Sequence, residues 1–121
     1  MAKLLIAARS ESLSSALAEA LTQYEVYNCH TGVDALVLLE SLRPDIFIVD
    51  LSLPVISGLA VLQETHYKPP VILALTNLVT ERILQSAIDT GVQHILLQPC
   101  AVRHIISHLE AQIQKNSTLD S

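Results

Sequence analysis

Asp50 is the residue in this sequence best placed to do chemistry. It ends a continuous apolar run that begins at Ile46, and such a run is typical of a strand buried on both faces. A proline four residues later, Pro54, and a glycine eight residues later, Gly58, indicate a loop. A carboxylate at such a point can bind a metal ion or pair with an arginine. Its chemistry therefore depends on the side chains that other elements bring beside it.

Ten segments alternate along the chain, five with the pattern of strands and five with that of amphipathic helices. The expected strands cover residues 3–7, 24–29, 45–50, 71–75 and 94–98. The expected helices cover residues 9–23, 31–42, 59–65, 79–91 and 102–115. Ser10 or Ser12 can cap the first helix and Thr31 the second, and Gly91 closes the fourth.

This alternation predicts an α/β fold of (βα)5 type, with a doubly wound, five-stranded parallel sheet of order 2-1-3-4-5 and flavodoxin-like architecture. We expect the first and fifth helices on one face of the sheet and the other three on the opposite face. Such sheets place their ligands at the carboxyl ends of the strands. Here these ends bring together the positions of Ala8, Arg9, Asp50, Thr76 and Gln98.

The composition excludes several classes of function. The 121 residues fit one domain, and 50% of them are hydrophobic, so a packed core is expected. A net charge of −5, few aromatic residues and no tryptophan argue against nucleic-acid binding by this domain. No apolar run approaches the roughly 20 residues of a membrane span, so we expect no membrane partner and a cytoplasmic location. Cys29 and Cys100 are expected to be reduced thiols.

Residues 3–114 resemble the receiver domain of two-component response regulators. The stretch DIFIVDLSLPVISGLAVL is similar to the third-strand segment of that family, with Asp50 where an aspartate takes a phosphoryl group from a histidine kinase. PVILALTN resembles the fourth-strand segment, with Thr76 at the switch position. GVQHILLQPC resembles the fifth-strand segment, which normally ends in lysine and proline and here keeps Pro99. The resemblance implies a two-component signalling role, as part of a phosphorelay.

Several positions depart from the family pattern. The acidic pair after the first strand reads Ala8 and Arg9, the lysine before the proline is Gln98, and the switch aromatic is Ile95. Phosphoryl transfer to a carboxylate needs positive charge on the phosphoryl oxygens, which the family supplies with Mg²⁺ and the lysine. The charges of Asp50 and Arg9 cancel, so we expect no metal at this site and weak or no Mg²⁺-dependent phosphorylation of Asp50.

Two site residues have alternative interpretations. Arg9 can pair bidentately with Asp50 or point to solvent at the start of the first helix. The hydroxyl of Thr76 can take part in signalling, as the resemblance implies, or bond to nearby backbone. His104 and His108 lie four residues apart, as in two-histidine metal sites, but no third ligand completes a motif and we expect surface histidines.

The expected function is therefore an atypical receiver domain that acts through protein–protein contacts. One alternative is an ordinary receiver phosphorylated at Asp50, with Mg²⁺ as its cofactor. Another is a flavodoxin-like cofactor-binding domain, whose loop ARSES could hold a phosphate. We otherwise expect no cofactor, and no enzymatic activity, because no nucleophile–base pair and no glycine-rich phosphate loop is present.

The resemblance also implies partners and a domain division. A histidine kinase is one candidate partner, and the surface made by the fourth helix, the fifth strand and the fifth helix is the expected partner or homodimer surface. Residues 1–115 are expected to form the receiver-like domain. Residues 116–121 are expected to be a polar tail, or the start of a linker to an output domain absent from this sequence, such as a DNA-binding transcription regulator.

Overall fold

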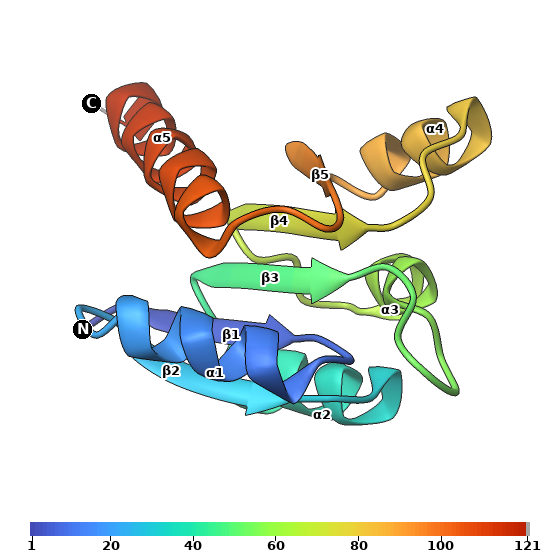
Figure 1. The fold of residues 1–121 in the computed structure, drawn as a ribbon, viewed down its shortest axis with the longest axis horizontal. Coiled ribbons are helices and arrows are strands. Elements are labelled where there is room, and N and C mark those ends of the chain that lie inside the picture. Colours follow the sequence, from blue (N-terminus) through green and yellow to red (C-terminus); the bar gives the residue numbers. More distant parts are fainter. Residues whose placement is uncertain (121) are drawn as a thin grey trace.

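Five parallel strands form one sheet in the order β2-β1-β3-β4-β5, and five helices cover it (Figure 1). The structure is a computed structural model that describes residues 1–120, with side chains on the last helix up to Lys115. The strands are β1 Lys3–Ala7, β2 Glu25–Cys29, β3 Ile46–Asp50, β4 Val71–Thr76 and β5 His94–Leu97. The helices are α1 Glu11–Ala20, α2 Gly32–Leu42, α3 Gly58–Glu64, α4 Glu81–Asp89 and α5 Val102–Asp120. The predicted fold class and strand order are confirmed.

The sheet has a hydrophobic core on each face, because successive side chains of a strand point to opposite sides. On β3, Phe47 contributes to one core, together with residues of α2, α3 and α4. Ile48 contributes to the other core, together with residues of α1 and α5. The predicted distribution of the helices over the two faces is therefore confirmed. It also explains why β3 and β4 read as continuous apolar runs.

Polar side chains cap the first two helices at the predicted positions. The hydroxyl of Ser10 accepts a hydrogen bond from the backbone of Leu13 at 3.1 Å, so Ser10 rather than Ser12 caps α1. Thr31 caps α2 in the same way. Gly91 follows α4 with a φ of 100°, a conformation that favours glycine.

The last helix is longer than predicted. It was expected to end at residue 115, but α5 continues to Asp120. The polar composition of residues 116–120 ends the apolar stripe of this helix, but the helical backbone continues through these residues. The side chains of the predicted tail, residues 116–121, lie outside the described part of the chain, and the proposed domain boundary stays a prediction.

The loop between β3 and α3 is built around two close backbone approaches. A Cβ atom on Gly58 would lie 2.2 Å from the carbonyl oxygen of Asp50, and one on Gly32 would lie 2.0 Å from that of Ile56. Only glycine fits at either position. The loop is thereby held against the end of β3 and the start of α2, and this fixes the backbone that carries Asp50. Among residues 1–120, no helix combines the length and the apolarity that a membrane crossing needs.

Candidate functional site

The carboxylate of Asp50 is held by its own loop. Its Oδ1 accepts hydrogen bonds from the backbone N–H of Ser52 at 2.9 Å and from the hydroxyl of Ser52 at 2.7 Å. Its Oδ2 receives only a long contact of 3.5 Å from the backbone N–H of Arg9. The side chain is half-buried at the carboxyl end of β3. One oxygen is therefore fully engaged, and the other is the more available for chemistry.

Arg9 does not pair with Asp50 through its side chain. Within the described part of the chain, no nitrogen of the guanidinium lies close enough to the carboxylate for an ion pair, and Arg9 is exposed. Of the two interpretations of Arg9, the solvent-facing one holds. Its backbone N–H, not its charge, makes the direct contact with Asp50.

Three of the predicted site residues line one pocket, which has a volume of about 260 Å³. Arg9, Asp50 and Gln98 come from the ends of three different strands, as expected for the carboxyl edge of a parallel sheet. The complete lining is Arg9, Ser10, Leu13, Asp50, Ser52, Asn77 and Gln98. One acid and one base face a pocket otherwise lined by neutral groups, and no aromatic side chain is among them. The flavodoxin-like alternative thus gains no support, because a flavin ring needs a stacking partner.

Ala8 and Thr76, the other two predicted site positions, do not line this pocket. Ala8 is buried in the core beneath α1 and α5. Thr76 is also buried, and its hydroxyl donates to the carbonyl oxygen of Leu78 at 2.9 Å and accepts from the N–H of Leu78 at 3.2 Å. The hydroxyl therefore closes the turn after β4, as the second interpretation of Thr76 requires. A signalling role of Thr76 remains a prediction.

Gln98 replaces a cation with a neutral amide. Its Oε1 accepts a hydrogen bond from the backbone N–H of Cys100 at 3.3 Å, while its Nε2 is buried without a hydrogen-bond partner. The backbone N–H of Gln98 donates to the carbonyl of Thr76 at 2.7 Å, which joins β5 to β4 at this edge. The amide adds a donor to the pocket but no positive charge.

The site does not fit Mg²⁺, the cofactor that the family resemblance implies. Asp50 is the only carboxylate that lines the pocket, and Arg9 occupies the position of an acidic ligand. Mg²⁺ is bound by carboxylate and other oxygen ligands in octahedral geometry. Among the side chains that the structure describes, those of residues 1–115, no group of three or more histidine, cysteine, aspartate or glutamate residues could hold a metal ion.

Ser52 is the functional residue that sequence reasoning missed. It supplies both hydrogen bonds to Oδ1 of Asp50 and also lines the pocket. The signal was present in the sequence, because an aspartate commonly accepts a hydrogen bond from the backbone two residues later at a turn. A serine at that second position can add its hydroxyl to the same oxygen.

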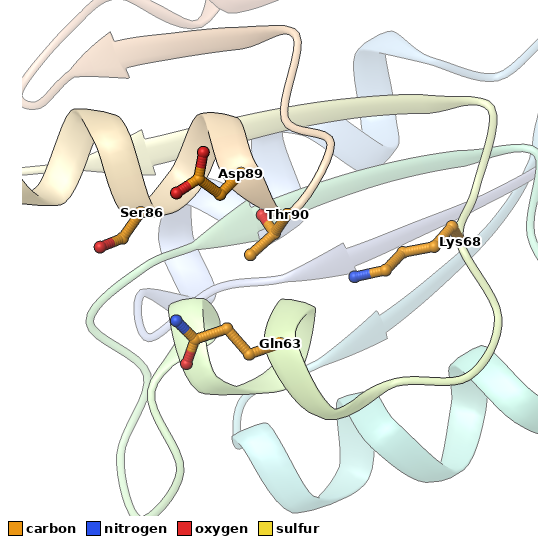
Figure 2. Close-up of a pocket in the computed structure, with 5 residues that line it drawn as sticks. All are labelled: Gln63, Lys68, Ser86, Asp89 and Thr90. Carbon is orange, nitrogen blue, oxygen red and sulfur yellow. The ribbon is translucent and has the colours of Figure 1, made fainter.

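A second pocket, of about 320 Å³, lies between α3 and α4 (Figure 2). Figure 2 shows Gln63 of α3 and Lys68 from the following loop facing three residues at the end of α4: Ser86, Asp89 and Thr90. The ammonium of Lys68 donates to the carbonyl of Leu62, and burial lowers its pKa. Asp89 accepts from Gln85, and Thr90 donates to Ala87. Because the charged residues of this pocket, Lys68 and Asp89, already have local partners, we assign the pocket a structural role.

Comparisons with known proteins agree with the fold. The family model described as "Response regulator receiver domain" matches residues 5–110. A curated relative, the response regulator MprA of Mycobacterium bovis (strain BCG / Pasteur 1173P2), is 28% identical over 102 residues, which are 81% of this chain and 44% of that protein. The chain thus spans less than half the length of this relative.

Two solved structures are also similar. The chemotaxis protein CheY4 of Vibrio cholerae shares 26% identity with a TM-score of 0.80, and the match covers 93% of this chain and 98% of that one. A response regulator from Burkholderia pseudomallei shares 25% identity with a TM-score of 0.78, covering 100% of this chain and 75% of that one. The latter structure contains a phosphorylated aspartic acid, a calcium ion and citrate.

Proposed function

Because the chain belongs to the response regulator receiver domain family, we propose that it is an atypical receiver, whose Asp50 accepts a phosphoryl group poorly or not at all. The family places it in two-component signalling. The atypical behaviour is the part that the site geometry supports. We further propose that the domain acts in the cytoplasm through contacts with other proteins, without catalysing a reaction of its own.

One observation carries this proposal: Asp50 is the only carboxylate in a pocket that also contains Arg9 and lacks a lysine. A phosphoryl group on Asp50 carries negative charge that needs nearby cations in the transition state. The ligands for Mg²⁺ are missing, and Gln98 offers only an uncharged donor. Oδ1 of Asp50 is in addition engaged by Ser52, which leaves Oδ2 as the oxygen that a phosphoryl donor could reach.

The test is phosphorylation by a small-molecule donor. After incubation with acetyl phosphate and Mg²⁺, we expect intact-mass spectrometry to detect no aspartyl phosphate. With beryllofluoride and Mg²⁺, we expect no spectroscopic change in the protein. A double variant, Arg9→Asp with Gln98→Lys, restores an acid and a cation at the pocket and should gain measurable Mg²⁺-dependent modification. Asp50→Asn in the double variant is the control and should abolish it.

Stoichiometric, Mg²⁺-dependent modification of the unaltered chain at Asp50 would contradict the proposal. It would favour the ordinary phosphorylatable receiver instead. Ala8 is left unchanged in the test because it is buried in the core, where an added carboxylate would have to be desolvated.

For the partner surface we propose the face made by α4, β5 and α5, as a self-association surface with twofold symmetry. Two large apolar side chains are more than half exposed there, Ile88 on α4 and Leu97 on β5. Ile88 is also part of the lining of a groove of about 270 Å³, which is formed by Leu84, Ile88, Val92, Gln93, His94 and Ile95. Isolated exposed apolar residues are common, but an exposed apolar residue that lines a groove supports a contact surface.

The charged residues exposed on α4 and α5 suit contact between two copies. Arg82 on α4 and Arg103 on α5 are exposed, as are Glu81 and Glu110. In an isologous contact, each base can meet an acid of the other copy. Such peripheral charges are screened by salt, so the association should weaken as ionic strength rises.

Light scattering of concentrated protein at low salt tests this surface. Arg82→Glu or Arg103→Glu should shift the protein towards monomer, whereas Glu19→Lys on α1, a charge reversal away from this face, should not. A strictly monomeric unaltered chain under these conditions would contradict self-association and favour a different protein as the partner. We propose a histidine kinase as one such partner, and a transcription-regulating output domain as the downstream element in the longer relatives.

A further inference from the structure

Two histidines from separate elements meet beside the sheet edge. His94 is the first residue of β5, and His108 lies on α5. Nδ1 of His108 is 3.1 Å from Nε2 of His94, and the two ring centroids are 4.9 Å apart at an interplanar angle of 46°. A neutral imidazole has one N–H and one lone pair, so one of these nitrogens donates and the other accepts. Two ring nitrogens that could both bind a metal ion are therefore held close together.

The backbone on both sides of this contact is firmly placed. His94 pairs with Leu73 of the inner strand β4 in the parallel ladder. His108 is flanked on α5 by Ile105 and Leu109, which are fully buried against the sheet. A short connection joins β5 to α5, and His94 and His108, which are fourteen residues apart in sequence, meet across it. The geometry between the two rings can therefore change by side-chain rotation alone, without a shift of the backbone.

The distance between the nitrogens suits a shared metal ion. Zinc–imidazole bonds are about 2.0–2.1 Å long, so two such ligands at a tetrahedral angle lie about 3.3 Å apart. A small rotation of the exposed His108 ring turns the 3.1 Å contact into that arrangement, with the ion in place of the shared proton. Imidazole is a ligand that favours zinc, copper and nickel. We propose that His94 and His108 form a binding site for a divalent transition-metal ion of this class.

The remaining coordination positions are open. His104 lies one turn before His108 on α5, is exposed, and is the nearest histidine in sequence that could join after a change of rotamer. As the described side chains stand, no third ligand completes the group, so water would have to complete the coordination of a bound ion. The site differs in kind from the Asp50 pocket, because Mg²⁺ is a hard ion that takes oxygen ligands and not imidazole. A bound ion would add positive charge to the α4–β5–α5 surface.

Calorimetric titration of the unaltered chain with Zn²⁺ tests the proposal, with Mg²⁺ as the comparison. We expect saturable binding of one Zn²⁺ per chain and no binding of Mg²⁺ at this site. His94→Phe keeps an aromatic ring in contact with His108 but removes both nitrogens, and His108→Ala removes the other ligand. Each should weaken Zn²⁺ binding at least tenfold. His66→Ala is the matched control, because His66 is exposed and it is the backbone N–H of His66 that donates to Glu40, so the variant should leave the affinity unchanged.

A second measurement separates direct binding from loss of folding. In nitrogen NMR of the histidine rings, Zn²⁺ should shift Nε2 of His94 and Nδ1 of His108 before those of His30 or His66. Far-ultraviolet circular dichroism checks that each variant keeps its helices. Zn²⁺ binding that is absent, or equal in the His94 and His108 variants and the unaltered chain, would overturn the proposal. Shifts spread equally over all histidines would show adventitious surface binding and would overturn it too.

Discussion

Replacement of Val55 by glycine should make this protein more stable. Val55 lies in the β3–α3 loop with a φ of 69°, in the left-handed region that β-branched residues rarely adopt. The N–H of Ile56 donates to the carbonyl of Pro54 at 2.8 Å, which closes a tight turn with Val55 at its centre. The side chain is 88% exposed, so its removal loses little buried surface.

The size of the effect follows from two opposing terms. The left-handed conformation destabilises a non-glycine residue by about 1–2 kcal/mol, and glycine, which has no Cβ atom, avoids this steric cost. Glycine increases the conformational entropy of the unfolded chain, which costs about 0.4–1 kcal/mol. Val55→Gly should therefore raise the free energy of unfolding by about 0.5–1 kcal/mol. With a typical urea dependence of about 2 kcal/mol per molar, the midpoint moves up by about 0.3–0.5 M.

Urea denaturation followed by circular dichroism measures this shift. Val37→Gly is the control, because Val37 is also exposed but lies inside α2. Glycine there should lower the stability by about 0.5 kcal/mol, since it is the poorer helix former. A decrease in stability for Val55→Gly, or changes of the same sign in both variants, would refute the strain argument.

Two further predictions concern close packing and a buried thiol. Gly58→Ala should destabilise the protein by about 2–3 kcal/mol, because the new Cβ atom would meet the carbonyl of Asp50 at 2.2 Å. Gly91→Ala should cost only about 1–2 kcal/mol, because its Cβ position has nothing within 4 Å and only the φ of 100° opposes it. The opposite ranking of the two variants in urea denaturation would contradict this account. Burial, and then the charge of Asp34, raises the pKa of the Cys29 thiol from 9.0 to about 12. The folded state thus keeps a proton that the unfolded chain releases, so stability should fall as the pH rises from about 9 to about 12, and less steeply in Cys29→Ala. Equal slopes for the two proteins would contradict the assignment to Cys29.

Most of the fold was predictable from the sequence because the pattern of apolar residues reports directly which surfaces are covered. The continuous runs of β3 and β4 require helices on both faces, and the helices are long enough for each crossover. Finer features depend on packing that no pattern contains. Ser14, for example, is a polar residue buried in α1, and its hydroxyl is satisfied there by donating to the carbonyl of Glu11.

The site was predictable in position but not in its contacts. The parallel arrangement of the strands places Arg9, Asp50 and Gln98 at one edge of the sheet, independently of how their side chains are oriented. Which group bonds to Asp50 depends on loop geometry, and Ser52 occupies Oδ1 while the guanidinium of Arg9 stays in solvent. The histidines show the same limit: the sequence spacing pairs His104 with His108, whereas the return of α5 along the sheet places His108 against a histidine of β5.

The same hydrogen bonds give Asp50 a structural part to play that is independent of phosphorylation. Its Oδ1 satisfies both the N–H and the hydroxyl of Ser52 at the start of the loop. Its carbonyl oxygen lies against Gly58, whose N–H donates to Leu51 at 3.1 Å. An acid at this position thus shapes the turn that leads into α3, even where the cations for phosphoryl transfer are missing. The presence of an aspartate at the end of β3 is for this reason not sufficient to assign a working phosphorylation site, and the charges around it decide the matter.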